Sequence, residues 1–122
     1  MSCVRHSYLI LTLIMIVSAC SKDKTAPSDN IKCDPNINFT YSNDVKPILD
    51  ASCAFTGCHS SSSKASGVVL DNYDDARKNT ENGKVICTIN YASGCAPMPP
   101  SGKLADSLIQ KIECWAKKGF VN

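Results

Sequence analysis

The residues with the most specific chemistry in this sequence are two cysteines and a histidine in one short segment. Residues 53–59 read Cys-Ala-Phe-Thr-Gly-Cys-His. The usual attachment motif for c-type haem is C-x-x-C-H, in which two thiols bond to the haem and the histidine ligates its iron. Here four residues separate Cys53 from Cys58, whereas the Cys58–His59 pair is intact. Gly57 gives the backbone the freedom that a longer arch needs. The segment therefore predicts a haem site.

A methionine further along the chain is the candidate for a second axial ligand. Met98 lies in the sequence Ala-Pro-Met-Pro-Pro, and the prolines restrict the directions in which its side chain can point. A lone methionine often only fills a gap in a core, but a proline-rich loop is poorly suited to that role. His/Met ligation is the cytochrome c pattern and raises the reduction potential. We therefore expect His59 and Met98 to ligate one iron.

With these residues, the sequence resembles the small class-I-type c cytochromes found as lipoproteins or as domains in Bacteroidetes and planctomycete-type proteins. The resemblance covers residues 39–122. The matching residues are Val45, Lys46, Pro47, Ile48, Leu49, Cys58, His59, Gly67, Leu70, Asp71, Tyr73, Pro97, Met98, Pro99, Leu104, Asp106, Ile109, Ile112, Trp115 and Gly119. The resemblance implies an all-α, class-I-like cytochrome c fold around one covalent haem c. It implies thioether bonds from Cys53 and Cys58, with His59 proximal and Met98 distal.

The N-terminal residues predict export and lipidation. Arg5 is followed by an apolar run over residues 8–17, which is too short to span a membrane. The run ends in Val-Ser-Ala-Cys, which resembles a bacterial lipobox with Cys20 as the lipidated residue; a plain signal peptide is the alternative. We therefore expect a signal peptide over residues 1–19 and a lipidated, flexible tether over residues 20–38. The haem domain follows over residues 39–122.

The cysteine count fits this scheme. The chain has 8 cysteines, a number that suits an oxidising compartment. If Cys53 and Cys58 both bond to haem, the mature chain keeps four cysteines besides Cys20 for two disulfides; attachment through Cys58 alone would leave an odd thiol. We expect the pairs Cys87–Cys95, which would pin the Met98 loop, and Cys33–Cys114, which would fasten the entering chain to the last helix. Pairing of Cys33 with Cys87 or Cys95 stays open.

Hydrophobic spacing predicts several short helices. A first helix is expected around Val45, Ile48 and Leu49, with Ser42 or Asn43 as N-cap and Pro47 in its first turn. A second is expected over residues 71–79 with Asp71 as its cap, and residues 84–90 fit either a helix or a strand. The serine-rich residues 59–67 and the proline-rich residues 94–102 are expected to form loops.

The C-terminal segment gives the clearest helical pattern. Leu104, Leu108, Ile112 and Trp115 recur at helical spacing and form one apolar stripe, with Gly119 in place to end the helix. Trp115 is expected to be a core aromatic.

Composition narrows the function. The net charge of +2 is too balanced for a nucleic-acid binder. We expect an electron carrier rather than an enzyme, anchored in the cell envelope through the lipid on Cys20 and facing the periplasm or cell surface. Its partners would be other envelope redox proteins. The alternatives are a haem-free, disulfide-stapled binding module, a zinc site built on Cys53, Cys58 and His59 with another cysteine, and a haem enzyme.

Overall fold

Regular structure in residues 32–122, the part that this computed structural model describes, consists of helices without β-strands. This confirms the all-α prediction. The α-helices are α1 (Lys46–Ser52), α2 (Tyr73–Glu81), α3 (Lys84–Ile89) and α4 (Asp106–Lys117), accompanied by a π-helical turn η1 (Tyr41–Val45) and a 3-10 turn η2 (Ala65–Gly67). The segment over residues 84–90, whose pattern fitted either structure, is thus helical.

The N-cap of the first helical segment lies two residues before Ser42, the earlier of its two predicted caps. Thr40 is the N-cap of η1, and its hydroxyl accepts a hydrogen bond from the Asn43 N–H at 3.3 Å. The Asp44 carboxylate accepts the Thr40 N–H in return at 2.9 Å. The prediction of Ser42 or Asn43 as cap was therefore wrong, because this reciprocal pair already closes the turn. Pro47 lies in the first turn of α1, as predicted.

The cap of α2 also differs from the prediction. Asn72 is the N-cap and accepts the Asp75 N–H at 3.0 Å. Asp71, the predicted cap, instead accepts two hydrogen bonds from Ser61 in the serine-rich loop, each at 2.6 Å. A long-range pairing thus occupies the side chain that local sequence rules assign to the helix.

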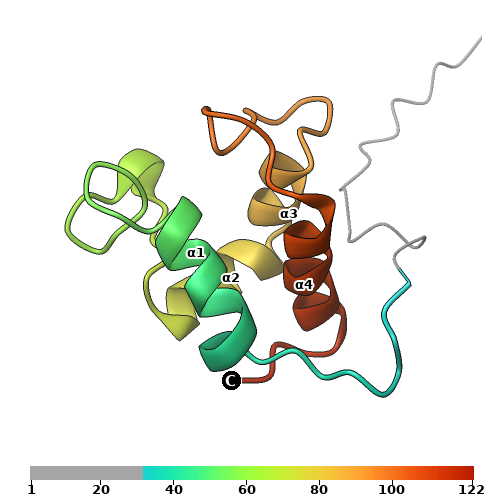
Figure 1. Cartoon of the computed structure of the whole chain (residues 1–122). Coiled ribbons are helices and arrows are strands. Elements are labelled where there is room, and N and C mark those ends of the chain that lie inside the picture. Colours follow the sequence, from blue (N-terminus) through green and yellow to red (C-terminus); the bar gives the residue numbers. More distant parts are fainter. Residues whose placement is uncertain (1–31) are drawn as a thin grey trace, which may run out of the picture.

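Helix α4 is the central packing element. It contacts η1, α2 and α3, so both halves of the chain meet on it (Figure 1). Its apolar stripe is as predicted, except that Leu104 lies before the helix begins at Asp106. The helix ends at Lys117 and Gly119 follows with a φ of +90°, the left-handed conformation that glycine adopts at little cost.

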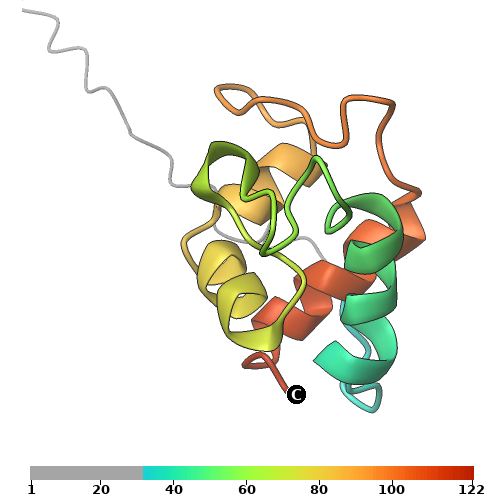
Figure 2. The same cartoon turned by 90° about the vertical axis from the view of Figure 1, so that its left-hand side faces the viewer.

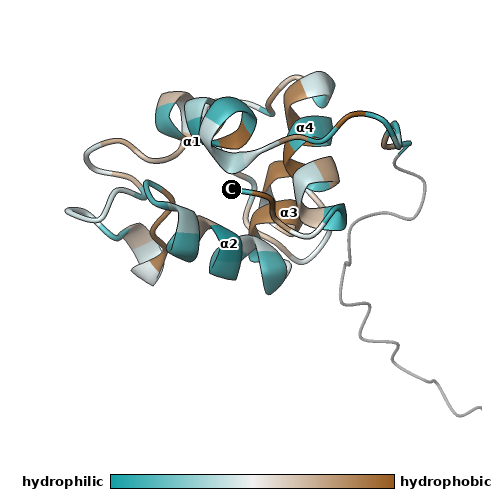
Figure 3. Ribbon diagram, turned by 90° about the horizontal axis from the view of Figure 1, so that it is seen from below, coloured by the Kyte–Doolittle hydropathy of each residue, from teal (hydrophilic) through white to brown (hydrophobic). Residues whose placement is uncertain are grey.

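The core is organised around Trp115, which is completely buried. Its ring packs against Tyr41, Tyr73 and Phe120, with centroids 4.9–6.4 Å away. Its indole N–H donates to the Val121 carbonyl at 2.8 Å, so the one polar atom of the ring is satisfied. In Figure 3 the hydrophobic parts of α3 and α4 lie toward the interior, while much of α2 is hydrophilic.

Residues 32–38 lie along α4, within the stretch predicted to be the tether. Cys33 is disulfide-bonded to Cys114 on α4, and Gln110 donates to the Lys32 carbonyl at 3.0 Å. The Lys118 ammonium lies within hydrogen-bonding distance of four oxygens of this segment, those of Asp34, Pro35, Ile37 and the Asn38 side chain, which share its three N–H donors. These contacts fasten the described start of the chain to the last helix.

Two long loops lie at the same end of the molecule, remote from the C-terminus. One is the green loop that follows α1, and the other is the orange loop between α3 and α4 (Figures 1 and 2). They contain, respectively, the predicted Cys–His segment and Met98. The helical framework therefore brings the predicted ligands toward one region.

Candidate functional site

A cavity of about 540 Å³ lies between the two loops. One wall comes from the end of α1 and the loop after it, and the other from the loop that precedes α4. The lining residues are Ala51, Ser52, Cys53, Phe55, Gly57, Cys58, His59, Ala65, Ser66, Met98, Pro99, Pro100, Ser101, Gly102 and Leu104. The volume lies in the range of about 300–1,000 Å³ typical of ligand cavities.

All four predicted haem residues line this one cavity. Cys53, Cys58 and His59 lie on one wall, and Met98 lies on the other. None of the lining residues is an Asp, Glu, Lys or Arg. The cavity thus offers two thiols, an imidazole and a thioether in mainly apolar surroundings, a donor set that fits a covalently bound haem.

His59 is held by its backbone and by its ring. Its N–H donates to the Cys53 carbonyl at 3.0 Å, and its carbonyl accepts the Leu70 N–H at 2.8 Å. Its Nδ1 lies 3.4 Å from the Val68 carbonyl, which can only accept, so this pairing requires a proton on Nδ1. The lone pair is then on Nε2, which leaves that nitrogen able to ligate a metal.

The serine-rich loop is hydrogen-bonded at two places, to the backbone of Gly57 in the cavity wall and to the side chain of Asp71 before α2. The Gly57 N–H donates to the Ser63 hydroxyl at 2.7 Å, and Ser61 donates to Asp71. The hydrogen bonds from the side chain and the backbone of Ser61 hold the pKa of Asp71 below its ordinary value. These supports were not predicted, because nothing in the spacing of Ser61 and Asp71 marks them as partners.

The two candidate attachment cysteines are free thiols. Cys53 is buried and Cys58 is half-buried. Burial, together with a smaller effect of the neighbouring Cys58, raises the pKa of the Cys53 thiol to about 11. Cys53 is therefore a neutral thiol at physiological pH, and its position in the cavity wall does not depend on a protein disulfide.

The loop that presents Met98 is tied to the end of α3. The Met98 N–H donates to the Thr88 carbonyl at 3.1 Å, and the Tyr91 hydroxyl donates to the Pro99 carbonyl at 2.5 Å. The disulfide Cys87–Cys95 closes the same region. Met98 itself is half-buried. The proline-rich loop is irregular, as predicted, and these contacts hold its backbone in one conformation.

Both predicted disulfides are present. Cys87 pairs with Cys95 and Cys33 pairs with Cys114, so the alternative pairings of Cys33 with Cys87 or Cys95 are wrong. Their formation leaves Cys53 and Cys58 as the free cysteines among the described residues. This is the distribution that the cysteine count predicts when both free thiols are reserved for haem.

The zinc alternative lacks a ligand set in the described part of the chain. No group of three His, Cys, Asp or Glu side chains within residues 32–122 is arranged to hold a metal ion. The other cysteines in that range are disulfide-bonded and cannot supply a further thiolate.

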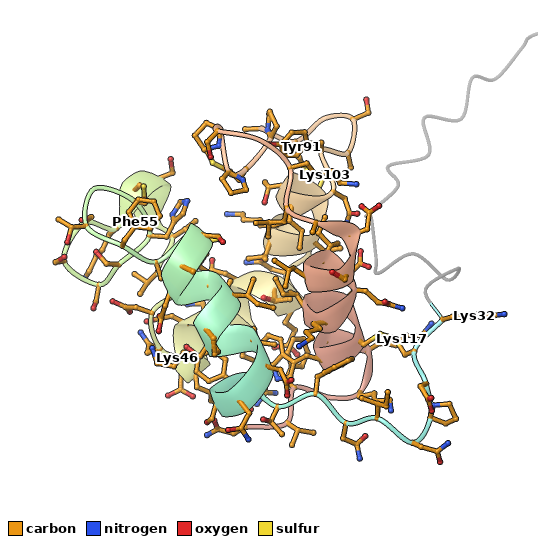
Figure 4. The ribbon with its side chains drawn as sticks, viewed as in Figure 1. Lys32, Lys46, Phe55, Tyr91, Lys103 and Lys117 are labelled. Carbon is orange, nitrogen blue, oxygen red and sulfur yellow. A yellow bond between two sulfur atoms is a disulfide. The ribbon has the colours of Figure 1, made fainter. Side chains whose placement is uncertain are left out.

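Sequence reasoning missed two contributors to the cavity wall. Leu104 was predicted on the helical stripe, but it precedes α4 and lines the cavity. Phe55 lies between the two cysteines, is 49% exposed and also lines the cavity. Figure 4 shows it on the loop after α1, far from Lys32. Their positions in the cavity wall follow from the folded conformation of the two loops and have no signal in the sequence.

The predicted signal peptide (residues 1–19) and the lipidated Cys20 lie outside the described residues. Within the described residues, no helix is both long and apolar enough to cross a membrane.

Comparisons with known proteins add no relative to this picture. No family model, curated protein or solved structure matches the chain. The similarity to cytochromes c therefore stays a prediction, and the case for a function depends on the geometry of the cavity.

Proposed function

We propose that this protein is a monohaem c-type cytochrome that carries single electrons between redox partners of the cell envelope. The supporting observation is that Cys53, Cys58, His59 and Met98, chosen from the sequence, line one cavity. These residues come from two loops about forty positions apart in the chain, on opposite sides of the cavity. A chance arrangement would not bring two free thiols, an imidazole and a thioether to one apolar space.

Each residue has a distinct task in this proposal. The thiols of Cys53 and Cys58 would add across the two vinyl groups of a haem, each S–H and vinyl double bond being replaced by a C–S and a C–H bond, and would so hold the haem to the chain. His59 ligates through Nε2, and its Nδ1–H···O=C bond to Val68 orients the ring and increases its basicity. Met98 supplies the thioether on the opposite side. A haem bound there supplies a one-electron couple, which thioether ligation shifts toward higher potential.

The walls of the cavity control access to this centre. Phe55, Leu104 and the prolines of the Met98 loop exclude water, which lowers the local dielectric and favours the less charged redox state. Both ligand-bearing loops are tied to the framework, so they require little movement when the charge changes. This suits an electron carrier better than an enzyme, since ligation by two side chains leaves no coordination position for a substrate.

The proposed setting is the cell envelope. A lipid on Cys20 would hold the domain near membrane-bound partners and raise its effective concentration there. The nearly balanced charge predicts weak electrostatic steering, so the partners are expected to associate at rates that depend little on salt.

Substitution of single cysteines tests the proposal. The protein is produced with a cytochrome c maturation system, and its absorbance is compared with that of Cys58→Ser, Cys53→Ser and the control Cys87→Ser/Cys95→Ser. We expect c-type absorbance in the native protein and in the control, a weaker single-thioether product from Cys53→Ser, and no holoprotein from Cys58→Ser. A colourless native protein would instead favour the haem-free, disulfide-stapled binding module.

A further inference from the structure

An exposed tyrosine, Tyr91, follows the C-cap of α3 in a left-handed backbone conformation. Tyr91 has a φ of +56°, in the left-handed region that glycine adopts more easily than any tyrosine. Its side chain is 37% exposed, so burial of the ring does not account for its presence. The Tyr91 and Ala92 N–H groups donate to the Thr88 and Cys87 carbonyls at 3.2 and 3.1 Å, so this left-handed conformation closes the end of α3. The backbone conformation is accounted for by the helix end, and the role of the side chain depends on its own contacts.

The Tyr91 hydroxyl reaches across the loop to the residue after Met98. It donates to the Pro99 carbonyl at 2.5 Å, over a separation of eight positions. On the other side of Met98, the Met98 N–H donates to the Thr88 carbonyl at 3.1 Å. Two hydrogen bonds to residues at the C-terminal end of α3 therefore hold the loop, one at Met98 itself and one at the residue after it. Figure 4 shows Tyr91 at the end of the molecule that carries this loop.

These two hydrogen bonds act together with the nearby disulfide. Cys87–Cys95 restrains the loop before it reaches Met98, whereas the Tyr91 hydroxyl restrains it immediately afterwards. Pro99 lacks an N–H and Pro100 follows it, so this segment has few backbone donors of its own. The Pro99 carbonyl also accepts the Gly102 N–H at 3.3 Å, but that bond lies within the loop. The Tyr91 hydroxyl therefore ties this part of the loop to the residues that follow α3.

We propose that Tyr91 is a positioning residue that holds the thioether of Met98 in place as the distal ligand. This inference rests on the proposed function. When the hydroxyl is present, the loop cannot swing away from the cavity without breaking the Tyr91–Pro99 hydrogen bond. When it is absent, Met98 leaves the iron more often, and an external ligand can take its position.

The test measures how fast imidazole binds to the oxidised holoprotein, since imidazole must displace the distal ligand. In Tyr91→Phe the ring is kept and only the hydroxyl is lost. We expect binding to be at least about threefold faster, the scale of one net hydrogen bond at a partly exposed site. The sulfur-to-iron charge-transfer band should weaken, and Tyr91→Gly, which relieves the backbone but removes the side chain, should behave at least as severely.

Tyr73→Phe is the matched control. The Tyr73 hydroxyl also donates to a backbone carbonyl, that of Phe120 at 2.7 Å, but in the aromatic core around Trp115. We expect this variant to lose stability without any change in imidazole binding or in the charge-transfer band.

The outcomes separate the two proposals. If the native holoprotein shows the charge-transfer band and Tyr91→Phe binds imidazole at the native rate, the role of Tyr91 is refuted while the cytochrome proposal stands. If Tyr73→Phe accelerates binding as much as Tyr91→Phe does, the effect is one of general stability and the inference is again wrong. If the native protein acquires no haem, the proposed function itself fails.

Discussion

At the residue scale, the carbonyl of Val68 determines which nitrogen of His59 can act as a ligand. The carbonyl accepts from Nδ1, and this leaves the lone pair on Nε2. The backbone of His59 is fixed by Cys53 on one side and by Leu70 on the other. The histidine is therefore held at three points before any cofactor binds, which reduces the cost of ordering it on ligation.

Met98 has no comparable substitute among the described residues, since it is the one methionine in that range. We expect Met98→Leu, which keeps an apolar side chain of similar volume, to retain covalent haem but to lose the charge-transfer band. The reduction potential should fall by about 100 mV or more, because thioether ligation favours ferrous iron. Redox titration with visible spectroscopy measures both effects.

The control for this substitution is Leu104→Ile, which changes the shape of the cavity without adding a thioether. Leu104 lines the same cavity, so the change tests whether altered packing alone moves the potential. A Met98→Leu protein with the native band and potential would show that Met98 only packs.

At the element scale, the serine-rich loop is stabilised by hydrogen bonds to Asp71, which lies two residues before α2 begins. Ser61 donates twice to Asp71, and these hydrogen bonds lower the pKa of that carboxyl below its ordinary value. A carboxyl whose pKa is lowered by folding stabilises the protein above its unfolded pKa, and this contribution is lost as the pH falls through the folded value. The loop that carries His59 should therefore be acid-sensitive.

Asp71→Asn tests this coupling. The variant should be less stable than the native protein at neutral pH, and the difference should shrink as the pH falls below the ordinary pKa of an aspartate and the native carboxyl becomes protonated. Urea unfolding at a series of pH values measures the effect. Asp74→Asn, on the exposed first turn of α2, serves as a control and should keep the native pH dependence. A constant difference between Asp71→Asn and the native protein at every pH would contradict the account.

The elements differ in how well the sequence predicts them. The α4 stripe is visible because Leu108, Ile112 and Trp115 recur at helical spacing, and Ile112 and Trp115 are completely buried in the core. The caps were predicted wrongly because Thr40 and Asn72 compete with equally suitable neighbours for the same turns. The choice between them depends on contacts such as Ser61–Asp71, which local patterns do not contain.

In the candidate site, too, some residues could be predicted from the sequence and others could not. Cys53, Cys58, His59 and Met98 could be selected by residue type and spacing, because their chemistry is distinctive. Leu104, Phe55 and Tyr91 could not, since an apolar or aromatic residue in a loop has no distinctive pattern. Their roles depend on how two separate loops meet across the cavity.

At the scale of the whole molecule, the first described residues are tied to α4 and the cavity is formed by loops at one end. The Cys33–Cys114 disulfide and the oxygens around Lys118 fix where the chain enters the domain. In the chain-entropy model, a loop of this length contributes about 4.5 kcal/mol. An anchor before residue 32 would therefore be joined to the domain at a segment that is held firmly against α4.

Lipidation is the prediction that belongs to this scale. We expect the native protein to fractionate with membranes and Cys20→Ser to be released or to remain unprocessed, because two or more acyl chains give firm attachment and a polar tether gives none. Fractionation followed by immunoblotting measures this, and Ser21→Ala, next to the predicted lipid site, is the control. A Cys20→Ser protein of normal mature size that stays on the membrane would place the anchor elsewhere.

The central claim, that one haem is bound covalently through the cavity cysteines, is tested most directly by the intact mass of the protein made with a cytochrome c maturation system. The account predicts a mature polypeptide heavier by one haem, a group that survives extraction with acidified acetone, with the addition mapping to the peptide that contains Cys53 and Cys58. A mass equal to that of the polypeptide without haem, with Cys53 and Cys58 as free thiols or bonded to each other, would contradict it.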